Sequence, residues 1–497
     1  MSGIYSNPPP KGQGKLSSDA EMNGGSAAEP RPVADPIGEA RVNESRAGES
    51  RAGELTTGES TTAELSVGEP TVPRADAVDG LAHGAITDAA ETTVIEIPRI
   101  ARALRHRDFR LFWTGNFLSN IGTWMQNIAQ GWLVLQLTNS AFWLGVVGFA
   151  ASFPILLFAL IGGVIADHVN KRKLLMVTQS AMMIFAFIMA ALAYFKIINV
   201  REIVFLALGT GIAMSLNTPT YQALVPQLVP REDLTNAIAL NSAQFNMSRV
   251  LGPTLGGFAM ALFGVAGNFF LNGLSFLAVL IALTRIRYIE PAAPPEGHLW
   301  EKLKQGFVYV FRHSAMSSLV LLVAIGSLLA IPYLTFVPYF ARDVLASDEP
   351  GLGVLMACSG AGAFLGAITI ASLMHLRHRG LFVVRASLGF YAAIIAFTFS
   401  RNFYLSGLLL AVAGYCMIIS VATINSLLQH LAEDHMRGRV MSIYSTAFLG
   451  LPPIGCLIAG SMAHVIGAPL AIAGMSALAL LGSLGVYLGR AGLRELD

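Results

Sequence analysis

Five polar side chains recur on one face of an apolar stretch near residues 111–137. On an α-helix they fall within about 80° of one another, because successive residues are about 100° apart. Amide and hydroxyl groups both donate and accept hydrogen bonds, so they could bind polar groups of a solute or join neighbouring helices. Both interpretations remain open at this point. The five residues are Asn116, Asn120, Thr123, Asn127 and Gln130.

One charge lies well within another apolar stretch. Arg249 could meet an anionic solute, or it could stabilise one end of its helix. No Asp or Glu lies in the middle of an apolar stretch, so the sequence offers no obvious buried carboxylate to carry a proton. We find no Ser/His/Asp set, no His cluster and no Walker-type glycine loop, which argues against an enzyme or an ATP-driven pump.

The three cysteines all fall inside apolar stretches. Their spacing predicts neither a disulfide framework nor a metal cluster, and we expect no metal and no cofactor. They are Cys358, Cys416 and Cys456.

The composition indicates that these residues lie on helices within a membrane. The chain has 497 residues, of which 54% are hydrophobic and 13% charged, whereas soluble domains carry about 25% charged residues. We therefore predict an all-α polytopic membrane protein. Each helix that spans the membrane should be a stretch of about 18 or more apolar residues. We place twelve, near 111–137, 142–166, 174–195, 202–222, 237–263, 265–284, 316–340, 352–376, 381–399, 403–427, 440–463 and 467–489.

Residues 1–98 differ from the rest of the chain. They carry 16 acidic and 7 basic residues, and Glu recurs every fifth residue from Glu39 to Glu69. A period of five matches neither a helix nor a strand, and little apolar surface is available to bury. We therefore expect a disordered acidic tail without a cleavable signal.

The Lys and Arg residues predict the orientation. With a cytoplasmic N-terminus, the inner segments hold 20 of them and the outer loops hold four. The positive-inside rule then places both termini in the cytoplasm. We expect a multi-pass protein of the inner (cytoplasmic) membrane.

The twelve stretches form two halves. The longest connection, 285–315, separates a half at 99–284 from a half at 316–497, and we expect it to carry an amphipathic surface helix with Leu303, Phe307, Val310 and Phe311 on one face. The two halves also share sequence features, which indicates an internal repeat. Leu144-Gly145 corresponds to Leu352-Gly353 at an offset of 208, and Gly257 to Gly460 at an offset of 203. Such a duplication places a site between the halves near the midplane.

A short basic turn follows the second stretch. Asn170 precedes three cations, Lys171, Arg172 and Lys173, and we expect it to end the helix in the left-handed conformation. Asp167 lies at the C-terminal end of its own helix, where the dipole disfavours a carboxylate, so it should be held by a partner elsewhere.

The chain resembles the major facilitator superfamily in three features. They are the twelve apolar stretches, the turn at 163–173 and the Gly-Pro-x-x-Gly-Gly at 252–257. Five further segments resemble the superfamily's branch of enterobactin-type siderophore exporters and macrolide efflux pumps. The resemblance covers about 105–490. The segments are 107–113, 219–226, 251–257, 338–344 and 437–441.

The resemblance implies a gate built from two motifs. In the family the turn latches the two halves on the cytoplasmic side, and the glycines of the fifth span belong to a motif of exporters. His168 and Asn170 depart from the family pattern of the turn, as do Ala239 and Ser248 from the glycine motif. The expected gating residues are Gly163, Asp167, Lys171, Arg172, Arg437, Arg439, Gly252, Pro253, Gly256 and Gly257.

The resemblance also implies a cavity lined by spans one, four, seven and ten. We call the five polar residues Asn116, Asn120, Thr123, Asn127 and Gln130 the polar stripe. The expected substrate-binding residues are the polar stripe, Arg249, Asn217, Tyr221, Tyr333, Tyr339, Tyr415 and Asn425. We expect a monomeric secondary transporter that exports an amphipathic small molecule, of drug or siderophore type, by alternating access. Protons as the coupling ion follow from the resemblance alone, and no nucleic acid is expected as a partner. The alternative is an importer or uniporter of a small metabolite.

Overall fold

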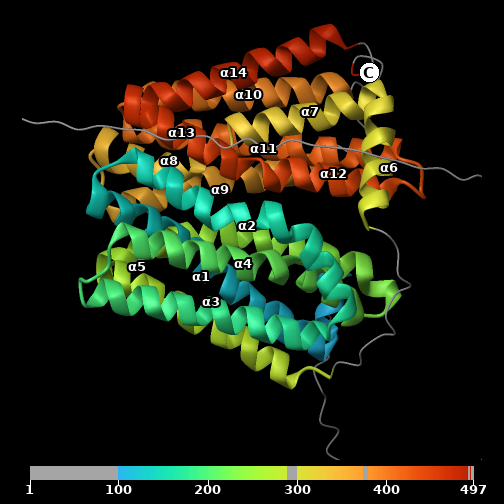
Figure 1. The fold of residues 1–497 in the computed structure, drawn as a ribbon, viewed down its shortest axis with the longest axis horizontal. Helices are drawn as coiled ribbons and strands as arrows, with labels where there is room; N and C mark the ends of the chain where they lie inside the picture. Colours follow the sequence, from blue (N-terminus) through green and yellow to red (C-terminus); the bar gives the residue numbers. More distant parts are fainter. Residues whose placement is uncertain (1–98, 288–298, 373–378, 491–492, 494–497) are drawn as a thin grey trace, which may run out of the picture. The chain divides into compact units, whose positions relative to one another are not determined.

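The computed structural model describes residues 99–287, 299–372, 379–490 and 493, and within these it gives no side-chain account of 99–100, 159–168, 299–303 and 379. The acidic tail predicted at 1–98 lies outside the described residues. Helices and short turns make up the described chain, which contains no strand (Figure 1). The fold is therefore all-α, as predicted.

Five long helices form the first half. They are α1 (Arg107–Thr138), α2 (Ala141–His168), α3 (Lys171–Tyr194), α4 (Val200–Leu224) and α5 (Leu234–Arg285), with short turns η1 (Arg99–Arg105), η2 (Val225–Gln227) and η3 (Arg231–Asp233). The second half follows the connecting helix α6 (Leu299–Arg312). It comprises α7 (Ser314–Leu329), α8 (Tyr333–Tyr339), η4 (Phe340–Val344), α9 (Glu349–Ser372), α10 (Arg379–Phe399), α11 (Phe403–Leu431), α12 (Arg437–Gly450), α13 (Pro452–Ile466) and α14 (Ala468–Gly489).

Ten helical segments of the described chain are long and apolar enough to cross a membrane. One of them, Arg231–Arg285, is 55 residues long and breaks at Gly264. The φ of 69° and ψ of 179° at this residue are angles that glycine adopts and other residues rarely do. It therefore holds two crossings. The 32-residue α1 lies in the bundle as well but is not among the ten, because its polar residues lower its hydropathy. The described helices thus provide the twelve predicted spans.

Two spans are broken, which the sequence analysis did not predict. The stretch expected at 316–340 bends between α7 and α8, at Ala330–Pro332, and the stretch at 440–463 bends at Leu451, immediately before Pro452. Proline lacks the amide hydrogen of the helical ladder, so each break is explained by a proline at the start of the following helix. The apolar composition continues through both breaks, and hydropathy alone does not reveal them.

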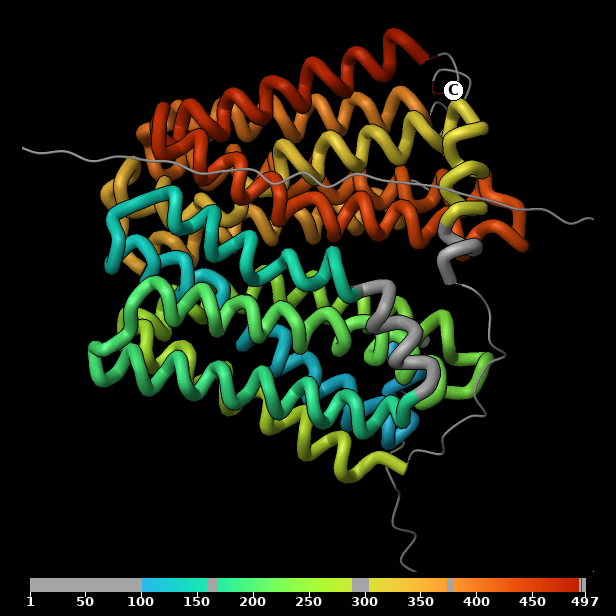
Figure 2. The backbone as a smooth tube through the Cα atoms, viewed as in Figure 1, coloured from blue at the N-terminus to red at the C-terminus, as the bar shows by residue number. Residues whose placement is uncertain are grey.

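The helices run side by side, with one half on either side of a central interface (Figure 2). We call the end that holds Arg107, Lys171, α6 and Arg437 the basic end, and the end that holds Asn139, Gly264 and Gly467 the opposite end. At the basic end α6 crosses the ends of the spans instead of running with them (Figure 1). Its predicted apolar face is divided: Val310 is fully buried, whereas Phe307 and Phe311 are exposed.

Local capping fixes two of the turns. Asn170 has φ −54° and ψ 110°, which is not left-handed, and its side chain accepts a hydrogen bond from the Lys173 amide at 3.0 Å. The expected left-handed helix end is therefore wrong, and Asn170 instead caps the start of α3. At the opposite end Asn199 and Glu202 form a capping box at the start of α4.

Paired glycines bring the two halves into contact near the opposite end. A methyl group on Gly145 of α2 would lie 2.8 Å from the Cα atom of Gly460 in α13, and one on Gly257 of α5 would lie 2.9 Å from the Cα atom of Gly353 in α9. No side chain fits between these backbones. The offsets of 208 and 203 found in the sequence relate the two contacts, so the duplication produces two equivalent contacts. We call the two glycine contacts together the glycine seal.

We expect Gly257→Leu to keep this seal open, because the larger side chain cannot lie against the α9 backbone. Thr335, which lies beyond the seal, would then become accessible from the opposite end. The measurement is labelling of a Thr335→Cys variant, with the native cysteines replaced, by a membrane-impermeant thiol reagent. Gly474→Leu is the matched control, since no atom lies within 4 Å of a methyl group at Gly474. Unchanged labelling in the Gly257 variant would contradict the seal.

Candidate functional site

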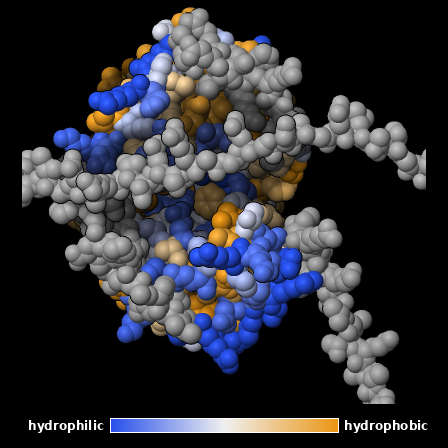
Figure 3. Space-filling view, turned by 90° about the vertical axis from the view of Figure 1, so that its right-hand side faces the viewer, coloured by the Kyte–Doolittle hydropathy of each residue, from blue (hydrophilic) through white to orange (hydrophobic). Residues whose placement is uncertain are grey.

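A cavity of about 330 Å³ lies between the halves on the basic-end side. It is lined by α2 and α4 from the first half and by α12 from the second, and we call it the α12 cavity. Hydroxyl and amide groups are frequent on its wall: Ser215, Thr218, Gln222, Ser442, Ser445 and Thr446. Viewed from the basic end, the surface is hollowed between the halves and hydrophilic side chains show inside it (Figure 3).

These hydroxyls were missed in the sequence analysis. Ser442 and Thr446 each donate a hydrogen bond to a backbone carbonyl one helical turn earlier, at 3.0 and 2.9 Å. Their oxygen lone pairs remain available to accept hydrogen bonds from a solute. The recurrence of Ser442, Ser445 and Thr446 at helical spacing was the available signal, but it lies in a span that the predicted four-span cavity did not include.

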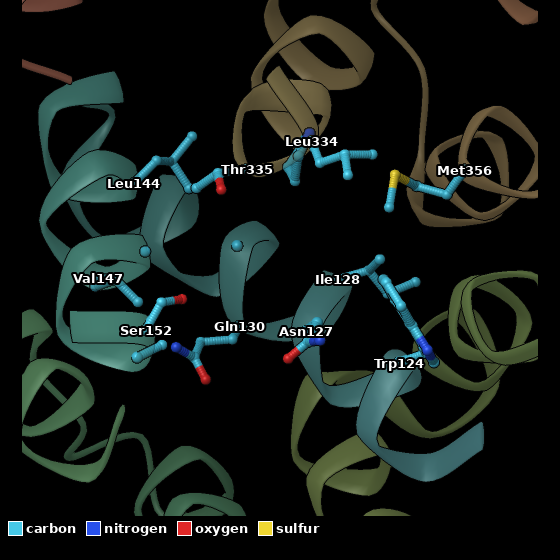
Figure 4. Close-up of a pocket in the computed structure, with 14 residues that line it drawn as sticks. Trp124, Asn127, Ile128, Gln130, Leu144, Val147, Ser152, Leu334, Thr335 and Met356 are labelled. Carbon is cyan, nitrogen blue, oxygen red and sulfur yellow. The ribbon is translucent and has the colours of Figure 1, made fainter. Parts of the chain in front are cut away.

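A second cavity, of about 200 Å³, lies closer to the opposite end. It is bounded by α1, α2, α8 and α9, and we call it the α8 cavity. Trp124, Asn127 and Gln130 reach it from α1, and the Gln130 amide extends toward α2, where Ser152 lies (Figure 4). The other walls are mostly apolar, including Leu144 and Met356. Such a site can hold an apolar body and hydrogen-bond a few polar groups.

The polar stripe of α1 is therefore divided. Asn127 and Gln130 line the α8 cavity, while Asn116 is 7% exposed and lines neither cavity. Asn120 is partly buried, and the Thr123 hydroxyl donates to the Ser119 carbonyl of its own helix.

On α4 the predicted residues join neighbouring helices. The Asn217 carbonyl oxygen accepts hydrogen bonds from Thr178 and Gln179 of α3, both at 3.1 Å. Tyr221 donates to Asn241 of α5 at 2.7 Å. Asn217 is buried and lines neither the α8 nor the α12 cavity, and its role in substrate binding stays a prediction.

The candidates of the second half are dispersed. Tyr333 is fully buried and shares a hydrogen bond with Ser359 at 3.1 Å. Tyr339 packs against the main apolar core, and the Asn425 carbonyl oxygen accepts from Gln429 at 2.6 Å. Tyr415 is partly buried on α11. None of the four lines the α8 or α12 cavity.

Arg249 occupies a distinct place between the halves. Its side chain is 9% exposed, and its guanidinium carbon lies 5.9 Å from the centre of the Trp124 ring, in cation–π range. From the other half, the Met417 sulfur lies 4.0 Å from one guanidinium nitrogen. No carboxylate of the described residues pairs with this arginine. A buried charge without a counter-ion is costly, which makes Arg249 a candidate for an anion.

The expected gate at the basic end is only partly described. Gly163 and Asp167 lie in the part of α2, 159–168, for which the structure gives no side-chain account. Lys171 is buried, and Arg172 donates to the Thr284 carbonyl at 3.0 Å, within the first half. Arg437 pairs with Asp434 at 2.7 Å, and Arg439 lies 3.0 Å from the Met436 sulfur, both within the second half.

The glycine motif of α5 contacts two different helices. A methyl group on Gly256 would lie 3.0 Å from the Met125 Cα atom, and one on Gly252 would lie 2.9 Å from the Ile121 carbonyl, so both face α1. Gly257 and the Pro253 carbonyl face α9 in the other half. The motif therefore supports one contact within a half and one contact between halves.

A polar contact accompanies the glycine seal. The Trp132 indole donates to the Glu349 carboxylate at 3.0 Å, and this bond joins α1 to the first residue of α9. Sequence reasoning missed Glu349, because it lies at the end of a span, where a carboxylate is ordinary.

A family model described as "transmembrane secretion effector" matches residues 101–497. The chain belongs to this family of major facilitator transporters. The predicted resemblance to the exporter branch is thereby confirmed, and the chain is not an enzyme.

Three curated relatives cover most of the chain. The staphyloferrin A transporter of Staphylococcus aureus is 25% identical over 72% of this chain and 90% of that protein. The enterobactin exporter EntS of Escherichia coli is 26% identical, over 76% and 90% respectively. The multidrug efflux pump Tap of Mycolicibacterium fortuitum is 28% identical, over 74% and 92%.

Solved structures confirm the fold. A bacterial homologue of the human lysosomal transporter Spinster, in an inward-facing and unoccupied conformation, superposes with a TM-score of 0.61 over 80% of this chain and 98% of that one, at 14% identity. The nucleoside transporter NupG gives a TM-score of 0.60 at 12% identity, over 77% and 98%.

We expect a cysteine scan of α1 to give two results. A water-soluble thiol reagent should label Asn127→Cys strongly, because that side chain is exposed in the α8 cavity, and should label Asn116→Cys weakly, because it is buried. Ala129→Cys, which is fully buried, is the control for background labelling. Equal labelling at 116 and 127 would contradict the division of the stripe.

Proposed function

We propose that the chain exports an amphipathic small molecule of drug or siderophore type from the cytoplasm, by alternating access and in exchange for protons. The observation that carries this proposal is the asymmetry between the two ends. The halves meet through paired glycines near the opposite end, whereas a cavity with several hydroxyl groups on its wall lies between them on the basic-end side. With the basic end in the cytoplasm, as the positive-inside rule predicts, this arrangement would receive a substrate from inside the cell.

The two cavities fit an amphipathic substrate. The walls of both cavities are mostly apolar and can accept a hydrophobic part. Hydroxyl groups of α12 supply polar contacts in one cavity, and Asn127 and Gln130 supply them in the other. The names of the curated relatives, which include siderophore transporters and a multidrug efflux pump, support this substrate class. Proton coupling rests on the family resemblance.

Transport requires the seal to open and the basic end to close. The glycine contacts are held by packing, so opening them costs free energy because backbone surface becomes exposed. Bound substrate must therefore stabilise the conformation in which these contacts are open. On the basic end we propose that Asp167 meets the α12 region around Arg439 once the halves approach. In the present arrangement Arg437 and Arg439 contact residues of their own half.

Vesicle transport tests the direction. In inverted membrane vesicles with an acidic lumen, we expect the chain to accumulate a siderophore or a drug against its gradient, because lumenal protons leave as substrate enters. The Gly257→Leu variant, present at equal abundance, should accumulate little of either. Accumulation in right-side-out vesicles alone would support the alternative of an importer, and equilibration without accumulation in either kind of vesicle would support a uniporter.

Arg249 predicts a preference for anionic substrates. A charge-assisted hydrogen bond contributes about 1.5–3 kcal/mol, so Arg249→Met should lower transport of a carboxylate-bearing siderophore about tenfold or more. Transport of a cationic dye should change less, and Arg249→Lys should retain part of the siderophore transport because it keeps the charge. Equal losses for both substrates in the Met variant would instead assign Arg249 to the stability of the bundle.

A further inference from the structure

A second polar site lies at the basic end, away from the transport cavities. A cavity of about 410 Å³ opens between α6 and the start of α12, and we call it the α6 pocket. Three cations line it: Lys304 and Arg312 from α6, and Arg439 from α12. Its remaining wall is formed by Gln305, Val308, Tyr309 and Met436.

No counter-ion to these three cations lies among the side chains that the structure describes. Neither Lys304 nor Arg312 makes a hydrogen bond or ion pair with any described residue, and Arg439 has only the Met436 sulfur, at 3.0 Å. The two carboxylates of the adjoining loop are engaged elsewhere. Asp434 pairs with Arg437 at 2.7 Å, and Glu433 lies 3.4 Å from His435. Three cations around one cavity, none of them paired with a described carboxylate, favour an anionic ligand.

The same helix carries an exposed apolar strip beside the cations. Phe307 is 56% exposed and Phe311 is 48% exposed, and their ring centres lie 4.3 Å apart. On a helical wheel Phe311 and Lys304 lie only about 20° apart, so the apolar strip adjoins the pocket directly. Exposed aromatic rings next to a group of cations match a ligand with a hydrocarbon part and an anionic part.

The setting of α6 supports the same conclusion. The helix crosses the ends of the spans at the basic end (Figure 1). Because spans of this length match the hydrocarbon thickness, we expect their ends to lie near the headgroups. Basic pockets at this level bind phosphate-bearing headgroups, and nearby apolar surface meets the acyl chains. A soluble anion would gain nothing from the two phenylalanine rings.

We propose that the α6 pocket binds an anionic phospholipid, with the headgroup phosphate among Lys304, Arg312 and Arg439 and the acyl chains against Phe307 and Phe311. Bound there, the lipid links the connecting helix to α12. Gly306 of α6 already packs closely on α12, since a methyl group on it would lie 2.9 Å from the Arg439 Cβ atom. Because α12 also forms a wall of the α12 cavity, the lipid holds that wall in place. This proposal does not depend on the direction of transport.

The test is native mass spectrometry of the purified full-length protein titrated with phosphatidylglycerol or phosphatidylcholine. We expect preferential binding of phosphatidylglycerol. Each cation near an anionic lipid contributes about 1 kcal/mol, or about fivefold, so the double variant Lys304→Gln/Arg312→Gln should bind about thirtyfold more weakly. The matched control is Arg105→Gln/Arg231→Gln, which removes two exposed cations from the same end outside the pocket and should bind as the native chain does.

Two further arms distinguish the source of the phosphate. Phe307→Ser/Phe311→Ser should weaken phosphatidylglycerol binding although all three cations remain. Inorganic phosphate and glycerol phosphate, at matched concentration, should not displace the lipid. The proposal is overturned if both double charge variants bind equally, if phosphatidylcholine binds as well as phosphatidylglycerol, or if inorganic phosphate competes fully. Melting temperatures of all variants, measured in detergent, confirm that the proteins compared are folded.

Discussion

The contact of glycine with glycine is the constraint on which the arrangement of the two halves depends. Helices that meet in a bilayer gain little from the hydrophobic effect, so close packing of their backbones must supply the attraction. Gly145 against Gly460 and Gly257 against Gly353 bring the helices together where any side chain would separate them. The α8 cavity, the Trp132–Glu349 bond and the burial of Arg249 all require the halves to lie this close.

Much of the fold could be predicted from the sequence, because span length and the positions of apolar residues follow from the thickness of a bilayer. The repeat was visible as well: the offsets of 208 and 203 pair Gly145 with Gly353 and Gly257 with Gly460, although only the structure shows that these glycines meet across the halves. The breaks at Pro332 and Pro452 were not predicted, since a proline within an apolar stretch is compatible with a bent or an interrupted helix.

The candidate site was harder to predict. A polar residue in a span has two ways to avoid hydrocarbon, and the sequence does not distinguish them. Asn127 faces a cavity, whereas Asn217 bonds Thr178 and Gln179 of the next helix. The partners of Asn217 lie about 40 residues away, so the choice depends on how α3 and α4 rotate against each other. The same reason explains why the hydroxyls of α12 were missed, since Ser and Thr commonly bond their own helix in apolar spans.

The break at Gly264 has a mechanical consequence. One residue alone separates the two spans within α5, and no atom lies within 4 Å of a methyl group placed there, so the glycine serves backbone direction and not packing. Because no loop lies between the two spans, their ends stay together at Gly264, while the φ and ψ angles of this glycine can change easily. The second of the two spans is bonded to α1 through Asn272 and Gln126. The glycine therefore fixes the point at which the span that carries the glycine seal can bend against its successor, and leaves the angle between the two spans free to change.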